Sequence, residues 1–142
     1  MKILVTGANG QLGTAFRRKW SGDKRNEYSY YNHDFDITNE ELVNRILNKE
    51  KPDIIINCAA YTNVKKAETE REKCYKVNYI GAYNLLSWCK ENNAYLITFS
   101  SDYVFNGMQS MPYKEDDKTK NSDNIYIFTF FPFRTDISPI FT

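Results

Sequence analysis

The sequence predicts an α/β protein in which a doubly wound parallel sheet lies between two layers of helices, a three-layer α/β/α architecture. Short apolar runs alternate with amphipathic stretches of helical length, an order typical of parallel strands joined by right-handed crossovers. The run IIIN is continuous in its apolar character, as in strands that are buried on both faces. With 142 residues the chain is long enough to form one such domain.

The first half of the pattern runs strand, helix, strand. Residues 2–6 (KILVT) form an apolar run followed by glycine, which predicts a buried strand. The stretch after the glycines is amphipathic through Phe16 and Trp20, which indicates a helix. Residues 26–31 are rich in tyrosine and give a weaker prediction of a strand near the edge of the sheet.

The second half of the pattern completes the order β-α-β-α-β-α-β. A second helix is expected to begin at a capping box made by Thr38 and Glu41. Residues 54–57 predict a strand buried on both faces. Apolar residues then recur at helical spacing over residues 72–92, which predicts one long helix, and residues 95–100 predict the fourth strand.

Composition argues against several classes of function. The 19 lysine and arginine residues nearly balance the 18 acidic residues, which gives no electrostatic case for binding nucleic acid or an anionic membrane. Cys58, Cys74 and Cys89 are widely spaced and His33 is the only histidine, so no metal site is predicted from the residues. The sequence has neither a signal-peptide pattern nor an apolar run near the roughly 20 residues that span a bilayer. We therefore expect a cytoplasmic protein.

The glycine-rich stretch GANGQLG places Gly7, Gly10 and Gly13 in GxxGxxG spacing between a strand and a helix. Gly7 suits a tight turn, Gly10 lets the backbone approach a pyrophosphate, and Gly13 lets the helix pack on the strand. A turn that merely collects glycines is the alternative reading. The strand before and the helix after favour dinucleotide binding and a Rossmann-type fold.

The residues that would select the dinucleotide do not decide between NAD and NADP. Asp34 and Asp36 stand near the position where an acid usually binds the adenosine ribose. Arg17 and Arg18, on the first helix, are candidates for contact with a 2′-phosphate, and solvated surface arginines are the equal alternative. Both cofactors stay open at this point.

Four further stretches give the sequence a family resemblance. They are NCAAYTNVKKAE at 57–68, VNYIGAYNL at 77–85, SSDYVFNG at 100–107 and PYKEDD at 112–117. Together they resemble the extended short-chain dehydrogenase/reductase superfamily, and within it the dTDP-4-dehydrorhamnose reductase family. The resemblance covers about residues 1–126, within a chain that we take as one NAD(P)-binding domain over 1–142.

The resemblance implies a reductase of dTDP-L-rhamnose synthesis, which passes hydride from NADPH or NADH to the 4-keto group of a dTDP-6-deoxy sugar. Ser101 would hydrogen-bond the keto oxygen, and Tyr126 would protonate it. The residues that the resemblance places at the cofactor are Gly7, Asn9, Gly10, Gln11, Leu12, Gly13, Asp36, Ile37, Cys58, Ala59, Ala60 and Tyr61. Those that it places at the nucleotide-sugar substrate are Thr62, Asp102 and Tyr103.

The sequence departs from the family pattern after Tyr126. The family has a lysine four residues after its tyrosine, where this chain has Phe130, and it continues into a lobe that binds the nucleotide sugar. Residues 127–142 are rich in phenylalanine and do not follow that pattern. We therefore expect the C-terminal substrate lobe to be lacking and activity to be impaired, because phenylalanine offers no charge to lower the pKa of a tyrosine.

Two further expectations rest on resemblance alone. Some family members form homodimers bridged by Mg²⁺, so a homodimer with Mg at its interface stays open for this chain. A relative, the regulatory beta subunit of methionine adenosyltransferase, resembles the chain in the SSDYVF stretch. The alternative function is therefore a non-catalytic NADP-binding module that docks on another enzyme.

Overall fold

The computed structural model describes residues 1–99, 108 and 110–114 of the chain. Within them the elements alternate as the sequence predicts. The strands are β1 (Lys2–Thr6), β2 (Glu27–Tyr30), β3 (Ile54–Asn57) and β4 (Tyr95–Thr98). The helices are α1 (Gln11–Lys19), α2 (Glu40–Glu50), α3 (Val64–Ala67), α4 (Arg71–Tyr75), a π-helical segment (Lys76–Gly81) and α5 (Ala82–Asn92).

The strands described form one parallel sheet in the order β2-β1-β3-β4. Ile3 of β1 pairs with Tyr28 on one side and with Ile54 on the other. The chain therefore steps from β1 outward to β2 and returns to the other side of β1, which makes the gap between β1 and β3 a topological switch point. Ligands of open α/β sheets bind at the carboxyl ends of the strands at such a point.

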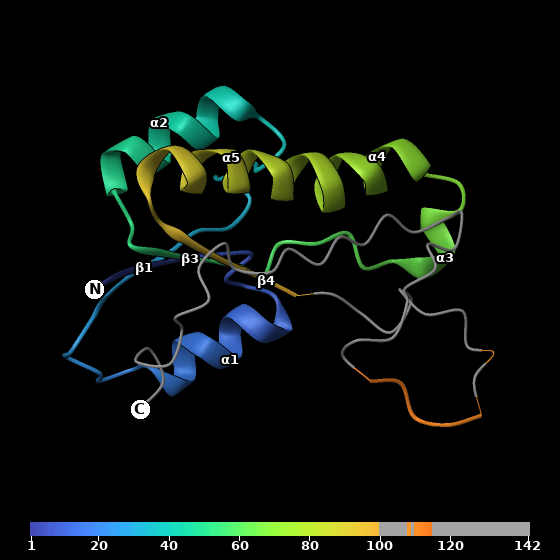
Figure 1. The fold of residues 1–142 in the computed structure, drawn as a ribbon, viewed down its shortest axis with the longest axis horizontal. Coiled ribbons are helices and arrows are strands. Elements are labelled where there is room, and N and C mark those ends of the chain that lie inside the picture. The colour runs from blue at the N-terminus through green and yellow to red at the C-terminus, as the bar shows by residue number, and fades with distance from the viewer. Residues whose placement is uncertain (100–107, 109, 115–142) are drawn as a thin grey trace.

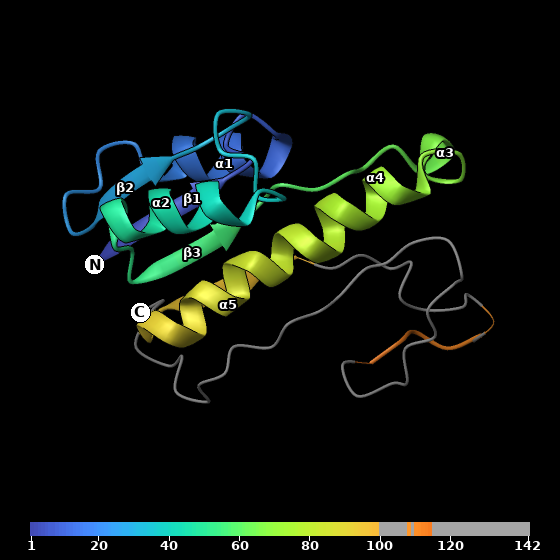
Figure 2. The same cartoon turned by 90° about the horizontal axis from the view of Figure 1, so that it is seen from above.

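Helices cover both faces of the sheet, so the predicted doubly wound, three-layer fold is confirmed. Helix α1 lies on one face, and α2 and α5 lie on the other (Figure 1). The helix that contains α4 and α5 runs past the carboxyl ends of the strands toward α3 (Figure 2). Among the described residues, none of the helices is long and apolar enough to cross a membrane.

Two apolar cores follow from this layering. The core between the sheet and α2 and α5 has these buried members: Leu4, Phe35, Ile37, Val43, Leu47, Ile55, Leu85, Trp88, Cys89 and Leu96. The core on the α1 side is smaller, with buried members Ile3, Val5, Ala8, Ile54 and Ile56. Alternate residues of β1 and β3 enter opposite cores, as expected of strands covered on both faces.

The start of α2 differs from the prediction. Asn39, rather than Thr38, is the N-cap, and its Oδ1 accepts a hydrogen bond of 3.0 Å from the Leu42 amide. The Thr38 hydroxyl instead donates to Asp36 Oδ1 at 2.8 Å. A capping residue needs a free side-chain acceptor next to the first turn, and here Asn39 provides it.

The long helix predicted over residues 72–92 is present, with one feature that the spacing did not reveal. It begins as α4 and ends as α5, but the turn between them, Lys76–Gly81, is π-helical. A π segment inserts extra backbone into a helix and is frequent at functional sites. Asn78 lies in this segment, and its side chain contacts the loop that follows β3.

Candidate functional site

The glycine loop turns sharply at the carboxyl end of β1. Gly7 has a φ of +59°, and an added Cβ would lie 2.6 Å from the backbone N of Ala59 and the backbone C of Cys58. Glycine is therefore required here for two reasons, the left-handed backbone and the close approach of the loop after β3. The glycine loop and the β3 loop thus meet at the switch point.

The other two predicted glycines lie at the start of α1. A Cβ on Gly13 would lie 2.5 Å from Ala8 Cα and 2.6 Å from the Gly7 carbonyl oxygen, so its absence lets α1 pack onto the turn. Gly10 is the N-cap of α1 and provides no side-chain hydrogen bond to the first turn. Close packing thus requires glycine at Gly7, against the β3 loop, and at Gly13, against the turn formed by Gly7 and Ala8.

The N-terminal end of α1 is open to solvent. Asn9, Gly10, Gln11 and Leu12 are all exposed, and the first turn consists of uncharged residues while basic residues gather in the last turn. Backbone N–H groups at a helix N-terminus carry partial positive charge and are a ready site for an anion such as a phosphate. The residues predicted to bind the phosphates thus lie at an exposed helix N-terminus.

The end of β2 is tied to the glycine loop. The Ala8 amide donates to the Tyr31 carbonyl at 3.0 Å, and the Asn9 amide donates to Asn32 Oδ1 at 2.6 Å. Asp34 accepts a 3.0 Å hydrogen bond from the Asn32 amide. Asp34 thus orders the turn that holds the glycine loop.

Asp36 and Ile37 occupy different surroundings. Asp36 is exposed, and its Oδ1 accepts hydrogen bonds from both the amide and the hydroxyl of Thr38. The Ile37 side chain is only 3% exposed and packs against Gly81, so this residue can offer a ligand its backbone only. The Ile37 carbonyl accepts a bond of 2.9 Å from the Asn84 side chain.

A buried polar network ties three strands together directly before the candidate site. The Thr6 hydroxyl donates to Asn57 Oδ1 at 2.6 Å, and Asn57 Nδ2 donates to Thr98 Oγ1 at 3.3 Å. The Ala59 amide donates to the same Asn57 oxygen at 3.2 Å. Because Thr6 and Asn57 are nearly fully buried, each hydrogen bond is costly to break.

The loop after β3 is held a second time by Asn78. Its Oδ1 accepts from the Tyr61 amide at 2.7 Å, and its Nδ2 donates to the Tyr61 carbonyl at 3.2 Å. The π-helical turn aims this amide at the loop. The paired hydrogen bonds identify Asn78 as an anchor of this loop.

The loop residues held by Asn57 and Asn78 form one wall of the site, beside the glycine loop, and are partly open to solvent. Cys58 and Ala59 are half-buried, and Ala60 and Thr62 are exposed. Burial raises the pKa of the Cys58 thiol to about 11, so near neutral pH it is uncharged and behaves as a small apolar residue.

Most of the predicted cofactor residues are brought together by this arrangement. Around the switch point lie Gly7, Asn9, Gly10, Gln11, Leu12, Gly13, Cys58, Ala59, Ala60 and Tyr61. Asp36 and Ile37 instead follow β2, the strand next to β1 on the side away from β3. The predictions for Ser101, Asp102, Tyr103, Tyr126 and Phe130 lie outside the described residues. In the described part, histidine, cysteine and acidic side chains nowhere gather in a group that could hold a metal ion.

Comparison with known proteins shows the family of this chain. The family model described as RmlD substrate binding domain matches residues 1–127. A dTDP-4-dehydrorhamnose reductase from Aggregatibacter actinomycetemcomitans is 39% identical over 117 residues, which are 82% of this chain and 40% of the relative. The spore coat polysaccharide biosynthesis protein SpsK of Bacillus subtilis is 37% identical over 82% of this chain and 41% of its own length.

Solved structures share the fold. A dTDP-4-dehydrorhamnose reductase from Clostridium acetobutylicum superposes with a TM-score of 0.82 at 42% identity, over 84% of this chain and 43% of that one. The reductase from Bacillus anthracis, solved in complex with NADP, gives a TM-score of 0.79 at 36% identity over the same shares. This chain spans about two fifths of the length of these relatives. It belongs to the family of RmlD-type dTDP-4-dehydrorhamnose reductases.

Proposed function

We propose that this chain binds NADP at the glycine loop and is the cofactor-binding part of a reductase that acts on a dTDP-4-keto-6-deoxy sugar. The observation that carries the proposal is the open N-terminus of α1 at the switch point, where Gly7 packs against the β3 loop. Such a point is where doubly wound folds bind dinucleotides. The relatives named as reductases support the same function.

The site fits a dinucleotide by the form of its backbone. Gly10 stands at the N-cap without a side chain, so the exposed backbone of Gly10, Gln11 and Leu12 is free to approach a pyrophosphate. Ala59, Ala60 and Tyr61 form the opposite wall beside the ribose and nicotinamide. The Bacillus anthracis relative, solved in complex with NADP, supports NADP as the cofactor.

Arg17 is the candidate contact for the 2′-phosphate of NADP. Its guanidinium lies 4.8 Å from the ring centre of Tyr30, the last residue of β2. The adenosine ribose of a bound dinucleotide lies near the end of the second strand. A cation held over an aromatic ring there is positioned to receive a phosphate, whereas Asp36 would repel one.

The bound cofactor would supply hydride to the keto carbon of the sugar. In the proposed reaction Ser101 donates a hydrogen bond to the keto oxygen, and Tyr126 delivers the proton to it. Thr62, Asp102 and Tyr103 are proposed to contact the sugar nucleotide. Phe130 brings no positive charge to lower the pKa of Tyr126, so proton delivery by this chain is expected to be slow at neutral pH.

The test of the reductase is oxidation of NADPH, followed at saturating cofactor with dTDP-4-keto-6-deoxymannose. We expect oxidation that depends on the sugar nucleotide and that falls about a hundredfold or more in Ser101→Ala, the loss typical of a group that assists proton transfer. Sugar-independent oxidation, or full activity in Ser101→Ala, would contradict the proposed chemistry. The non-catalytic module is not favoured, because the relatives compared above include several proteins named as reductases.

A further inference from the structure

We propose that Glu70 is a positioning residue for the cofactor site, because it fixes the side chain of Tyr61 from outside the site. The Tyr61 hydroxyl donates a 3.0 Å hydrogen bond to Glu70 Oε2. The same carboxylate oxygen lies 3.6 Å from Lys73 Nζ, and that ammonium lies 5.8 Å from the centre of the Tyr61 ring. The inference rests on the proposed function, since it assumes that the loop carrying Tyr61 faces a cofactor.

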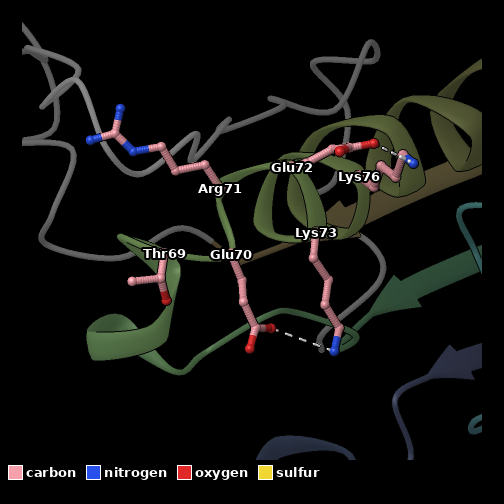
Figure 3. A pocket seen from close by; sticks show the side chains of 6 residues that line it. All are labelled: Thr69, Glu70, Arg71, Glu72, Lys73 and Lys76. Carbon is pink, nitrogen blue, oxygen red and sulfur yellow. Dashed lines mark ion pairs between the residues drawn. The ribbon is translucent and has the colours of Figure 1, made fainter.

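The position of Glu70 is itself fixed by the backbone. Glu70 is the N-cap residue of α4, and its carbonyl accepts a 3.0 Å hydrogen bond from the Cys74 amide. The carboxylate of Glu70 and the ammonium of Lys73 point toward each other from adjacent turns (Figure 3). Tyr61 is therefore held by a group anchored at a helix start, and a charged acceptor makes this hydrogen bond stronger than a neutral pair.

Glu70 and Lys73, which we call the clamp, contact the Tyr61 side chain, the part of the loop that the other hydrogen bonds do not hold. Asn57 holds the Ala59 amide, and Asn78 holds the backbone of Tyr61. Neither fixes the direction of the Tyr61 ring, which Glu70 and Lys73 do. Ala60 is exposed between these anchors. Losing Glu70 would thus release the wall opposite the glycine loop while the strands stay paired.

The same helix provides a matched control. Glu72 and Lys76 form an ion pair of 2.7 Å two to three residues further along, and both side chains line the same open hollow of about 460 Å³ as Glu70 and Lys73 (Figure 3). This pair also joins a glutamate to a lysine along the helix, at i,i+4 spacing instead of i,i+3, and its contacts are between Glu72 and Lys76 rather than with Tyr61. Removing the Glu72–Lys76 pair therefore shows the effect of a lost ion pair on this helix, while the contacts of Tyr61 stay in place.

The experiment compares Glu70→Ala, Glu70→Gln and Glu72→Ala by NADPH titration and by amide hydrogen exchange of the unliganded protein. Glu70→Ala is expected to weaken NADPH binding about three- to tenfold, the factor given by one lost hydrogen bond to a charged group at a partly exposed site. It also speeds exchange at Ala60 and Tyr61. Glu70→Gln keeps an acceptor for Tyr61 and recovers most of the affinity, whereas Glu72→Ala stays within twofold of the wild type.

Two results would overturn the inference. One is equal NADPH affinity and equal loop exchange in Glu70→Ala and Glu72→Ala. The other is a Glu70→Gln variant as weak as Glu70→Ala, which would assign the effect to charge rather than to the hydrogen bond. Tyr61→Phe gives an independent check, since it should weaken NADPH binding as Glu70→Ala does. If the folded wild type fails to bind NADPH, the proposed function fails, and the exchange data still decide whether Glu70 fixes the loop.

Discussion

Replacing Gly7 with alanine is expected to destabilise the fold more than any other glycine substitution in the loop. The residue combines a φ of +59° with three backbone atoms within 2.7 Å of an added Cβ. The left-handed backbone costs a non-glycine residue about 1–2 kcal/mol, and forcing atoms into a packed site costs a further ~1–3 kcal/mol. The free energy of unfolding should therefore fall by roughly 2–5 kcal/mol.

Two other glycines separate these contributions. Gly22 has a φ of +97° with nothing within 4 Å of an added Cβ, so Gly22→Ala should cost only the backbone part, about 1–2 kcal/mol. Gly13 lies within α1 and would clash with Ala8 and Gly7. Gly13→Ala should show the clash, reduced by the ~1 kcal/mol that alanine gains over glycine in a helix.

The assay is urea unfolding of the three variants at neutral pH, followed by circular dichroism. The midpoint should fall most for Gly7→Ala, at an unchanged slope. If Gly7→Ala proved as stable as Gly22→Ala, the close approach of the β3 loop to Gly7 would cost nothing, against this prediction.

Three further predictions address the strand network, the edge strand and the cofactor. Asn57→Ala should lower the free energy of unfolding by about 2–3 kcal/mol, since it leaves the buried Thr6 hydroxyl and its neighbours short of partners; urea unfolding within 0.5 kcal/mol of the wild type would contradict this. Hydrogen bonds from Tyr31 and Ser29 lower the pKa of Glu50, so its stabilisation is present above its unfolded pKa of ~4.3 and is lost as pH falls through the lower folded value. The stability difference between wild type and Glu50→Gln should accordingly shrink below about pH 4 in acid unfolding, and a difference independent of pH would rule out this role. Arg17→Ala should weaken NADPH binding about fivefold and leave NADH binding unchanged, as for one lost contact to a phosphate; equal loss for both cofactors in fluorescence titrations would exclude a 2′-phosphate contact.

Tyr31 gives the alkaline counterpart of the Glu50 effect. Burial and the hydrogen bond to Glu50 raise the pKa of Tyr31 to about 12. A folded pKa above the unfolded value of ~10 stabilises the protein fully below pH 10, and this contribution is lost as pH rises toward 12. Wild type and Tyr31→Phe should therefore converge in stability over that range.

The fold could be predicted from the sequence because its signals are local. IIIN at 54–57 and the glycine spacing at 7–13 are each contained in one short stretch of the chain. Their geometry follows from strand burial and from turns that only glycine permits. The start of α2 was misplaced by one residue, because Thr38 and Asn39 are both good caps. In the structure Thr38 donates to Asp36, and Asn39 accepts the hydrogen bond from the Leu42 amide.

The contacts that shape the site could not be predicted, because they join residues distant in sequence. Thr6 and Asn57 stand 51 positions apart, and Tyr61 and Asn78 stand 17 apart. No periodicity signals such pairs. The π-helical turn at Lys76–Gly81 could not be predicted either, because the spacing of its apolar residues is the same as in a regular α-helix. The one hint in the sequence is Asn78, which lies on an otherwise apolar face of the predicted helix although asparagine is disfavoured in helix interiors.

The most direct test of the account is NADPH binding by the wild-type chain and by Gly10→Val, measured by fluorescence titration. Gly10 is exposed at the N-cap of α1, and an added Cβ there would meet only the Gly7 carbonyl oxygen, at 3.2 Å. The variant should therefore fold, while its side chain occupies the approach to the helix N-terminus. We expect saturable binding of one NADPH by the wild type and a loss of affinity of at least tenfold in the variant, about 1.4 kcal/mol or more. Equal affinity in the two folded proteins, or no binding by the wild type, would contradict it.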